Sequence, residues 1–277
     1  MRSLATVDGV TLAVHELGGA GRPALLCHAT GFHGAMWEPF ATALGPDLER
    51  WAIDFRAHGT SVVPAEQPLE WTEFCTDVLT AVDGLGLPAG QVLGVGHSMG
   101  GAALVLAEQA RPGTFAGLFL YEPIVSPQRL RTDPADPMAN AAVRRRPSFP
   151  SHAEALANYA SKPPLNQLRA DALHAYVRHG LTQGEDGSVH LVCRPADEAR
   201  VYRNAGGHDA FASLGEVRCP VVVAVGDDAS GPVAFAPSVV GALPNGRLER
   251  FAHLGHFGPL EAPARVAAAV QAFALGL

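Results

Sequence analysis

The stretch VLGVGHSMGG, residues 92–101, decides how this chain folds. A short apolar run ends at Gly96, and a helical pattern begins at Gly100 and continues to Ala110. Between them stands the motif Gly-x-Ser-x-Gly, with Ser98 at its centre. Alone the motif is a loose pattern, but between a buried strand and a helix it is typical of the sharp turn that presents a nucleophilic serine. The glycines remove Cβ atoms for which such a turn has no room.

On both sides of this turn, short apolar runs alternate with helical patterns. The signal Asp8-Gly9 predicts a hairpin at the start. The expected strands are 5–7, 11–16, 24–27, 50–53, 92–96, 117–121, 221–225 and 247–251, and the expected helices are 36–44, 69–85, 99–110, 233–242 and 263–274. This alternation predicts an α/β fold, with a mostly parallel central sheet and helices on both faces.

Residues 124–215 break the alternation. They contain proline-rich turns and helical segments such as 151–160 and 168–179, but no convincing buried strand. A helical block that interrupts an α/β pattern predicts an inserted cap. We therefore expect residues 1–123 and 216–277 to form the core and residues 124–215 to form a helical cap.

Composition narrows the class of protein. The chain has 277 residues, and 48% of them are hydrophobic, which is the composition of a globular protein. Its net charge of -7 argues against a nucleic-acid-binding protein. Its four cysteines are widely spaced, which favours free thiols in a reducing compartment. The start of the chain has no signal-peptide pattern, and no run of 18 apolar residues suggests a membrane span. A cytoplasmic location is expected; the sequence does not indicate an oligomeric state.

Three further motifs extend the pattern around Ser98. They are LLCHATG at 25–31 with Trp37 beyond it, DFRAHGTS at 54–61, and Gly255-His256 followed by EAP at 261–263. Together with GHSMGG, and in this order, they resemble the α/β-hydrolase family over nearly the whole chain. The resemblance implies the family fold and no cofactor. It also implies a branch with a serine nucleophile, because the dehalogenase and epoxide hydrolase branches carry Asp at the position of Ser98. One departure is Ala29, where the family usually has Gly.

A serine hydroxyl needs a base to take its proton, and His256 is the predicted base. It lies between a strand and a helix and keeps the family's order of serine, acid and histidine. His253 is the competitor, and we expect it to be a loop residue packed beside the site. A metal on both histidines is not favoured, because no cysteine or carboxylate cluster would complete it. We expect the ring of His97 to pack away from the serine.

Two backbone N–H groups are predicted to stabilise the oxyanion. The turn geometry assigns one to Met99, and the resemblance assigns the other to Thr30. The Thr30 hydroxyl could add a third donor or cap the local turn. His28 is expected to brace this loop, and Asp54 to brace the turn that follows it in the chain.

The acid of the triad has two candidates. The family usually places Asp three residues after a Gly that ends the strand 221–225, but here that position is Ala229. Asp228 is one residue short, and such a shift turns an extended side chain to the opposite side. The other candidate is Glu122, after the strand 117–121, where some branches of the family, including haloalkane dehalogenases, carry the acid.

Glu122 is the preferred acid. Pro123 favours an extended conformation at Glu122, and a buried carboxylate needs a partner such as the His256 imidazole. The non-catalytic alternative is a salt bridge from Glu122 to Arg129 or Arg131.

These residues predict a serine hydrolase that cleaves a small carboxylic ester, thioester or lactone through an acyl-enzyme. The alternatives are a C–C bond hydrolase or a cofactor-free perhydrolase or haloperoxidase with the same triad, and a non-catalytic binding protein of the same fold. The expected partner is a small acyl substrate. The run 144–146, three arginines, is expected to be a solvated face, or a contact for an anionic partner.

Overall fold

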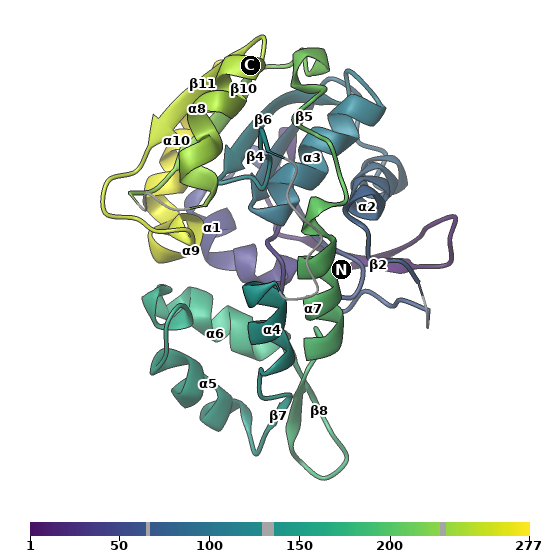
Figure 1. The fold of residues 1–277 in the computed structure, drawn as a ribbon, viewed down its shortest axis with the longest axis vertical. Coiled ribbons are helices and arrows are strands. Elements are labelled where there is room, and N and C mark those ends of the chain that lie inside the picture. The colour runs from purple at the N-terminus through teal and green to yellow at the C-terminus, as the bar shows by residue number, and fades with distance from the viewer. Residues whose placement is uncertain (65–66, 129–135, 228–230) are drawn as a thin grey trace.

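An eight-stranded sheet forms the centre of the molecule in the computed structural model, which describes residues 1–64, 67–128, 136–227 and 231–277 (Figure 1). The strand order is β1-β2-β4-β3-β5-β6-β10-β11. The pairs from β4 to β11 are parallel, and β2 pairs antiparallel with both β1 and β4. The strands are β1 (Arg2–Ala5), β2 (Thr11–Glu16), β3 (Arg22–Cys27), β4 (Leu48–Asp54), β5 (Val92–His97), β6 (Phe115–Tyr121), β10 (Val221–Val225) and β11 (Gly246–Arg250).

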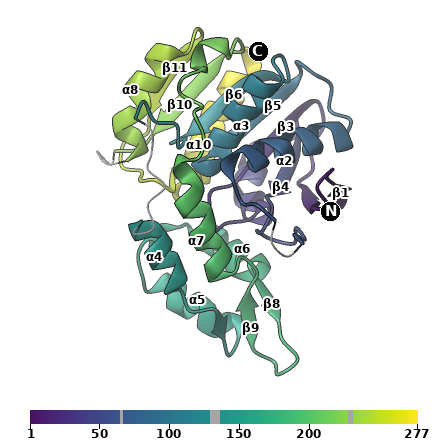
Figure 2. The ribbon, with the colours of Figure 1, turned by 45° about the vertical axis from the view of Figure 1, so that its right-hand side comes forward.

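Helices cover both faces of this sheet, as predicted (Figure 2). Strand β10 illustrates why, because Val221, Val223 and Val225 are buried in one apolar cluster, and Val222 and Ala224 in another. A strand buried on both faces needs a helical layer on each side. The first cluster includes residues of α2 (Trp71–Gly84), α3 (Met99–Ala110) and α8 (Pro232–Ala242), and the second includes residues of the 3-10 helix η1 (Gly34–Trp37), α1 (Glu38–Ala43) and α10 (Pro263–Leu275).

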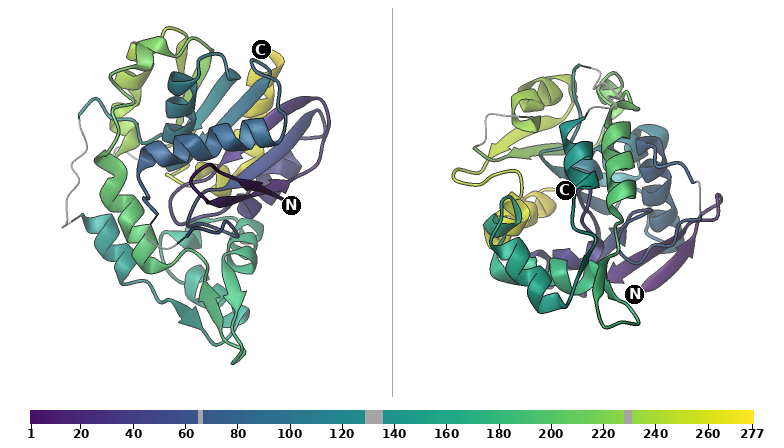
Figure 3. Two further views of the ribbon diagram at one scale, coloured as in Figure 1. Left: turned by 90° about the vertical axis from the view of Figure 1, so that its right-hand side faces the viewer. Right: turned by 60° about the horizontal axis from the view of Figure 1, so that its bottom comes forward.

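Residues 136–206, here called the cap segment, form a lobe beyond the sheet (Figure 3). The segment contains helices where we expected them, near 151–160 and 168–179. Its elements are α4 (Pro137–Val143), β7 (Ser148–Phe149), α5 (His152–Ala160), η2 (Leu165–Gln167), α6 (Ala170–His179), β8 (Leu181–Gln183), β9 (Val189–Leu191), α7 (Pro195–Arg203) and η3 (Asn204–Gly206). The short helices η4 (Leu214–Glu216) and α9 (Gly258–Glu261) lie in the core.

No convincing buried strand was expected in this part of the chain, but β7, β9 and β8 form a small antiparallel sheet. Val189 and Leu191 are buried while His190 between them is exposed, which is the alternation of a half-buried strand. Each strand has only two or three residues, too few for a recognisable period.

A buried ion pair anchors the turn after β4. Arg56 Nη2 lies 2.7 Å from Asp77 Oδ1, and neither side chain has exposed area. Arg56 Nη1 also lies 2.9 Å from Asp8 Oδ2. Removing one partner from such a pair leaves an uncompensated buried charge, which destabilises the folded state strongly.

We therefore expect Asp77→Asn to lower the free energy of unfolding by about 3 kcal/mol or more. Asp83→Asn is the matched control, because Asp83 lies on the same helix and pairs with Arg111 in solvent, with 64% of its side chain exposed. Its loss should be about 1 kcal/mol or less. Urea denaturation measures both, and equal losses would contradict the assignment.

Candidate active site

The turn that carries Ser98 is strained, and its glycines are required. Ser98 has φ 55° and ψ -115°, a conformation that side-chain-bearing residues rarely adopt. A Cβ atom on Gly100 would lie 2.3 Å from the carbonyl oxygen of Cys27, and one on Gly96 would lie 2.6 Å from Cα of Gly101. The turn therefore admits only glycine two positions before and two positions after the serine.

Glu122 and His256 are in direct contact. Glu122 follows β6, and His256 lies in the loop after β11, both at the carboxyl ends of parallel strands. Glu122 Oε2 lies 2.7 Å from His256 Nδ1, and Glu122 Oε1 accepts a hydrogen bond of 2.9 Å from the N–H of Gly226. Only 2% of the Glu122 side chain is exposed. Both carboxylate oxygens are thus fixed.

The backbone at Glu122 is also strained. Its φ is 44°, and such outliers cluster at functional sites, where the surrounding structure holds them. Pro123 had suggested an extended conformation at Glu122, which was wrong. The competing acid Asp228 lies outside the described residues, as do Arg129 and Arg131.

Three contacts hold the His256 loop in place. His97 Nε2 donates to the His256 carbonyl at 2.8 Å, and the Tyr121 hydroxyl donates to the Gly255 carbonyl at 2.9 Å. The N–H of Gly255 donates to Glu261 Oε2 at 2.9 Å. Burial, reinforced by the neighbouring His256, holds the pKa of His97 well below its usual value, so this imidazole is neutral.

His97, the residue before the nucleophile, therefore binds the backbone of the predicted base. This is more than the packing role expected from the sequence. The contacts of Tyr121 and Glu261 with this loop were not predicted. Both residues lie in or beside recognised motifs, since Tyr121 precedes Glu122 and Glu261 begins the EAP motif, but no local pattern indicates which backbone group they bind.

His253 does not pack beside the site. Its side chain is 93% exposed, and its N–H donates to Asp227 Oδ2. The expectation that it packs beside the site was therefore wrong. Among the described residues, no group of three or more His, Cys, Asp or Glu side chains could hold a metal ion.

The hydroxyl of Ser98 makes no hydrogen bond to His256 within the described residues, although Ser98 is only 8% exposed and its neighbour His97 touches the His256 loop. Contacts between nucleophile and base are often long until a substrate is bound.

The side chains of the two predicted oxyanion residues are in contact, because the Thr30 hydroxyl donates to Met99 Sδ at 3.3 Å. Across the described part of the chain, neither the Thr30 N–H nor the Met99 N–H donates to a protein acceptor. His28 braces this loop, because its Nδ1 donates to the Ala29 carbonyl at 2.7 Å and its Nε2 accepts from the Phe55 N–H at 3.1 Å.

Asp54 braces the neighbouring turn, as expected. Its carboxylate accepts from the N–H of Gly34 at 2.6 Å and from the N–H of Thr60 at 2.7 Å. Burial opposes ionisation, but hydrogen bonds and nearby histidines outweigh it and lower the pKa of Asp54.

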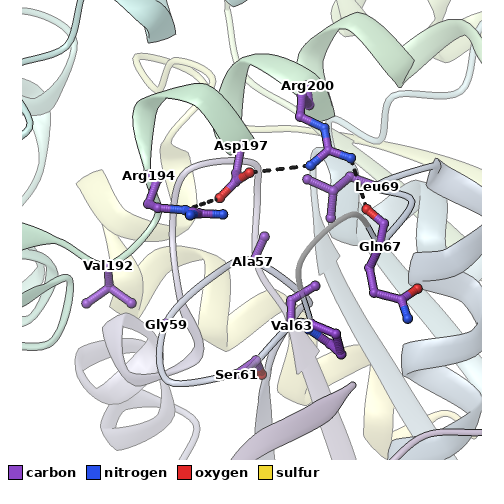
Figure 4. A pocket seen from close by; sticks show the side chains of 11 residues that line it. Ala57, Gly59, Ser61, Val63, Gln67, Leu69, Val192, Arg194, Asp197 and Arg200 are labelled. Carbon is purple, nitrogen blue, oxygen red and sulfur yellow. Dashed lines mark hydrogen bonds and ion pairs between the residues drawn. The ribbon is translucent and has the colours of Figure 1, made fainter. Parts of the chain in front are cut away.

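Two sizeable cavities lie beside the cap segment. One, of about 550 Å³, is lined by residues of that segment together with Thr30, Gly31 and Phe257, and therefore reaches the predicted oxyanion loop and the neighbour of His256. The other, of about 490 Å³, lies between α7 and the loop after β4 (Figure 4). There Asp197 pairs with Arg194 and Arg200, and Arg200 donates to the Gln67 carbonyl. Among the described residues, neither cavity is lined by Ser98, His256 or Glu122, and only the first includes a predicted oxyanion residue, Thr30.

Buried neutral histidines around this site predict a fall in stability with acid. Burial lowers the pKa of His33 and of His58 to about 4, and holds that of His28 and of His97 well below the usual value. Below about pH 6.5 the unfolded chain binds protons that the folded chain excludes. The free energy of unfolding should therefore fall from pH 6.5 to pH 4.5, by about 1 kcal/mol per pH unit for each such histidine.

Thermal denaturation across this pH range measures the effect. His253→Asn, at the exposed position, should leave the pH dependence unchanged, and His33→Asn should make it shallower. A melting temperature that is flat from pH 7 to pH 4.5 would contradict the burial argument.

Comparison with known proteins identifies the family of the chain. The model of the Alpha/beta hydrolase family matches residues 24–269. Human monoglyceride lipase (Homo sapiens) is 37% identical over 131 residues, which are 44% of this chain and 42% of that protein. The mouse enzyme (Mus musculus) is 32% identical over 128 residues, with the same two coverages.

Solved structures are similar over nearly the full length. The crystal structure of E-2-(acetamidomethylene)succinate hydrolase has a TM-score of 0.81 at 21% identity, covering 98% of this chain and 97% of that chain. An esterase from Rhodococcus sp. ECU1013 has a TM-score of 0.77 at 21% identity, covering 100% and 98%.

The chain belongs to the alpha/beta hydrolase family. The match with the curated relatives spans about two fifths of their length. No helix in the described ranges has both the length and the apolar composition to cross a membrane.

Proposed function

We propose that this protein is a serine hydrolase that cleaves small carboxylic esters, thioesters or lactones. Ser98 is the nucleophile, His256 the general base and Glu122 the orienting acid. The observation that carries the proposal is the 2.7 Å contact between Glu122 Oε2 and His256 Nδ1, at the sheet edge that also carries the strained Ser98 turn. With Nδ1 engaged by the carboxylate, Nε2 is the nitrogen left to accept a proton.

In this mechanism, Nε2 of His256 takes the Ser98 proton as Oγ attacks the substrate carbonyl carbon. The carbonyl oxygen becomes an oxyanion, which the N–H groups of Met99 and Thr30 stabilise. The imidazolium, stabilised by Glu122, gives its proton to the departing alcohol, and the acyl group stays on Ser98. Water, deprotonated by His256, then releases the acid and restores the serine.

We further propose that residues 124–215 are the cap of this site. The cavity of about 550 Å³ between the cap segment and Thr30 supports this assignment, since its size suits a small ligand. The names of the monoglyceride lipase relatives support ester cleavage. The four free cysteines are in keeping with a cytoplasmic location.

Labelling with a fluorophosphonate tests the nucleophile. The wild-type protein should form one adduct, on Ser98, and Ser98→Ala should lose both the adduct and ester hydrolysis while keeping its melting temperature. His253→Ala is the control and should still be labelled. Labelling of Ser98→Ala at the wild-type rate would refute the assignment, and a wild-type protein without adduct or turnover would be a binding protein.

Substitution at the two acid candidates tests the triad. Glu122→Gln keeps the shape of the side chain but removes the charge that stabilises the imidazolium, so kcat should fall by roughly 10²–10⁴. Asp228→Asn should change kcat by less than about tenfold, which is the matched control. A larger loss in Asp228→Asn than in Glu122→Gln, measured by ester hydrolysis, would reverse the assignment.

A further inference from the structure

Basic and tyrosine side chains gather around the cavity beneath the cap segment. The whole chain has 20 Lys and Arg residues against 27 Asp and Glu residues. The described lining of the cavity has one acidic side chain, Glu198, and four basic ones: Arg144, Arg145, Arg146 and Lys162. Three of the chain's four tyrosines, at 159, 176 and 202, also line it. An acidic protein thus surrounds one cavity with positive charge.

Arg145 is the least exposed of these four basic residues, and it lies with Glu198 near the predicted oxyanion loop. A Cβ atom on Gly31, the residue after Thr30, would lie 2.5 Å from Glu198 Oε1 and 3.5 Å from Arg145 Nη1. Only 19% of the Arg145 side chain is exposed. Its Nη1 donates to Glu198 Oε2, and its Nη2 donates to the hydroxyl oxygens of Tyr159, at 3.3 Å, and of Tyr176.

The two tyrosine hydroxyls keep a hydrogen to donate. Each oxygen already accepts from Arg145, and within the described residues neither hydroxyl donates to a protein acceptor. Two O–H donors beside a guanidinium are complementary to a carboxylate, which accepts several hydrogen bonds at once. Phe32, Phe149 and Phe257 line the same cavity, and such apolar surroundings strengthen an ionic hydrogen bond.

We propose that Arg145, Tyr159 and Tyr176 bind a carboxylate on the acyl part of the substrate, so that the preferred substrates are half-esters of short dicarboxylic acids. The inference rests on the proposed ester-hydrolase function, because it places the reacting carbonyl at Thr30 and the carboxylate at Arg145, and both residues line the same cavity. Arg144, Arg146 and Lys162 are exposed and add a positive field around this cavity.

Paired esters test the proposal. The 4-nitrophenyl half-esters of succinate, glutarate and adipate are each compared with a neutral 4-nitrophenyl ester of about the same length. At one or more lengths, kcat/KM for the charged ester should exceed that for its neutral partner by a factor on the order of 10 to 100, as expected for hydrogen bonds to a charged group. Added salt should reduce this ratio.

Variants show whether the named residues cause the preference for the charged esters. Arg145→Met, and separately Tyr176→Phe in case the first variant fails to fold, should lower the ratio of kcat/KM for the charged ester to that for its neutral partner by about tenfold or more. Glu198→Gln removes the competing carboxylate and should raise it. Arg178→Met is the control, because it removes the same charge from an exposed position on α6 and should change neither ester. A ratio near one at every length, or equal losses in Arg178→Met and Arg145→Met, would overturn the proposal.

Calorimetry with glutarate on Ser98→Ala separates this inference from the proposed function. If glutarate binds and Arg145→Met weakens binding, the anion site stands even if no ester is hydrolysed. If esters are hydrolysed but glutarate does not bind and the charged esters have no advantage, the anion site is refuted and the hydrolase remains.

Discussion

The contact between Glu122 and His256 constrains the whole site. A carboxylate with 2% exposure needs a partner for each oxygen, and Glu122 has them in the His256 imidazole and the Gly226 N–H. The second partner is set by the sheet, since β6 and β10 are in register up to Tyr121 opposite Ala224. Glu122, the residue after β6, is therefore opposite Val225, and its N–H donates to the Ala224 carbonyl at 2.8 Å. This places its side chain within reach of the N–H of Gly226, the first residue after β10. A shift of this register would leave the carboxylate buried and unpaired.

The proposed base depends in turn on groups that hold its loop. His97, Tyr121 and Glu261 come from β5, β6 and α9, and each binds a backbone atom of Gly255 or His256. His97 is adjacent to Ser98 in the chain, and its buried imidazole binds the carbonyl of His256, so it fixes the loop of the base relative to the nucleophile. The strain at Ser98 and Glu122 is held by the packed sheet and its flanking helices. Rigid elements thus define the geometry, and the cap segment supplies most of the cavity.

The sequence predicted the sheet and its helices well, because alternation of apolar runs and helical periods is a local signal. Strand β10 was expected at 221–225 and lies there. The helices α4 and α7 were not predicted, because one is short and begins with Pro137 and the other is rich in charged residues, two of which, Asp197 and Glu198, are buried in place of apolar ones. The contacts of Tyr121 with Gly255 and of Arg145 with Tyr176 join residues far apart in the chain, so local patterns could not reveal them. The run of arginines at 144–146 was recognised, but the sequence did not indicate that its middle member is only 19% exposed.

A crystal structure of the protein after reaction with a phosphonate ester would show the nucleophile, the base and the acid together. We expect a covalent bond from phosphorus to Ser98 Oγ, and a phosphoryl oxygen within about 2.7–3.1 Å of the N–H groups of Met99 and Thr30. Glu122 should remain on His256 Nδ1, and Nε2 should face the phosphonate. A carboxylate of Asp228 in place of Glu122 on Nδ1, or an adduct on another residue, would contradict the proposed triad.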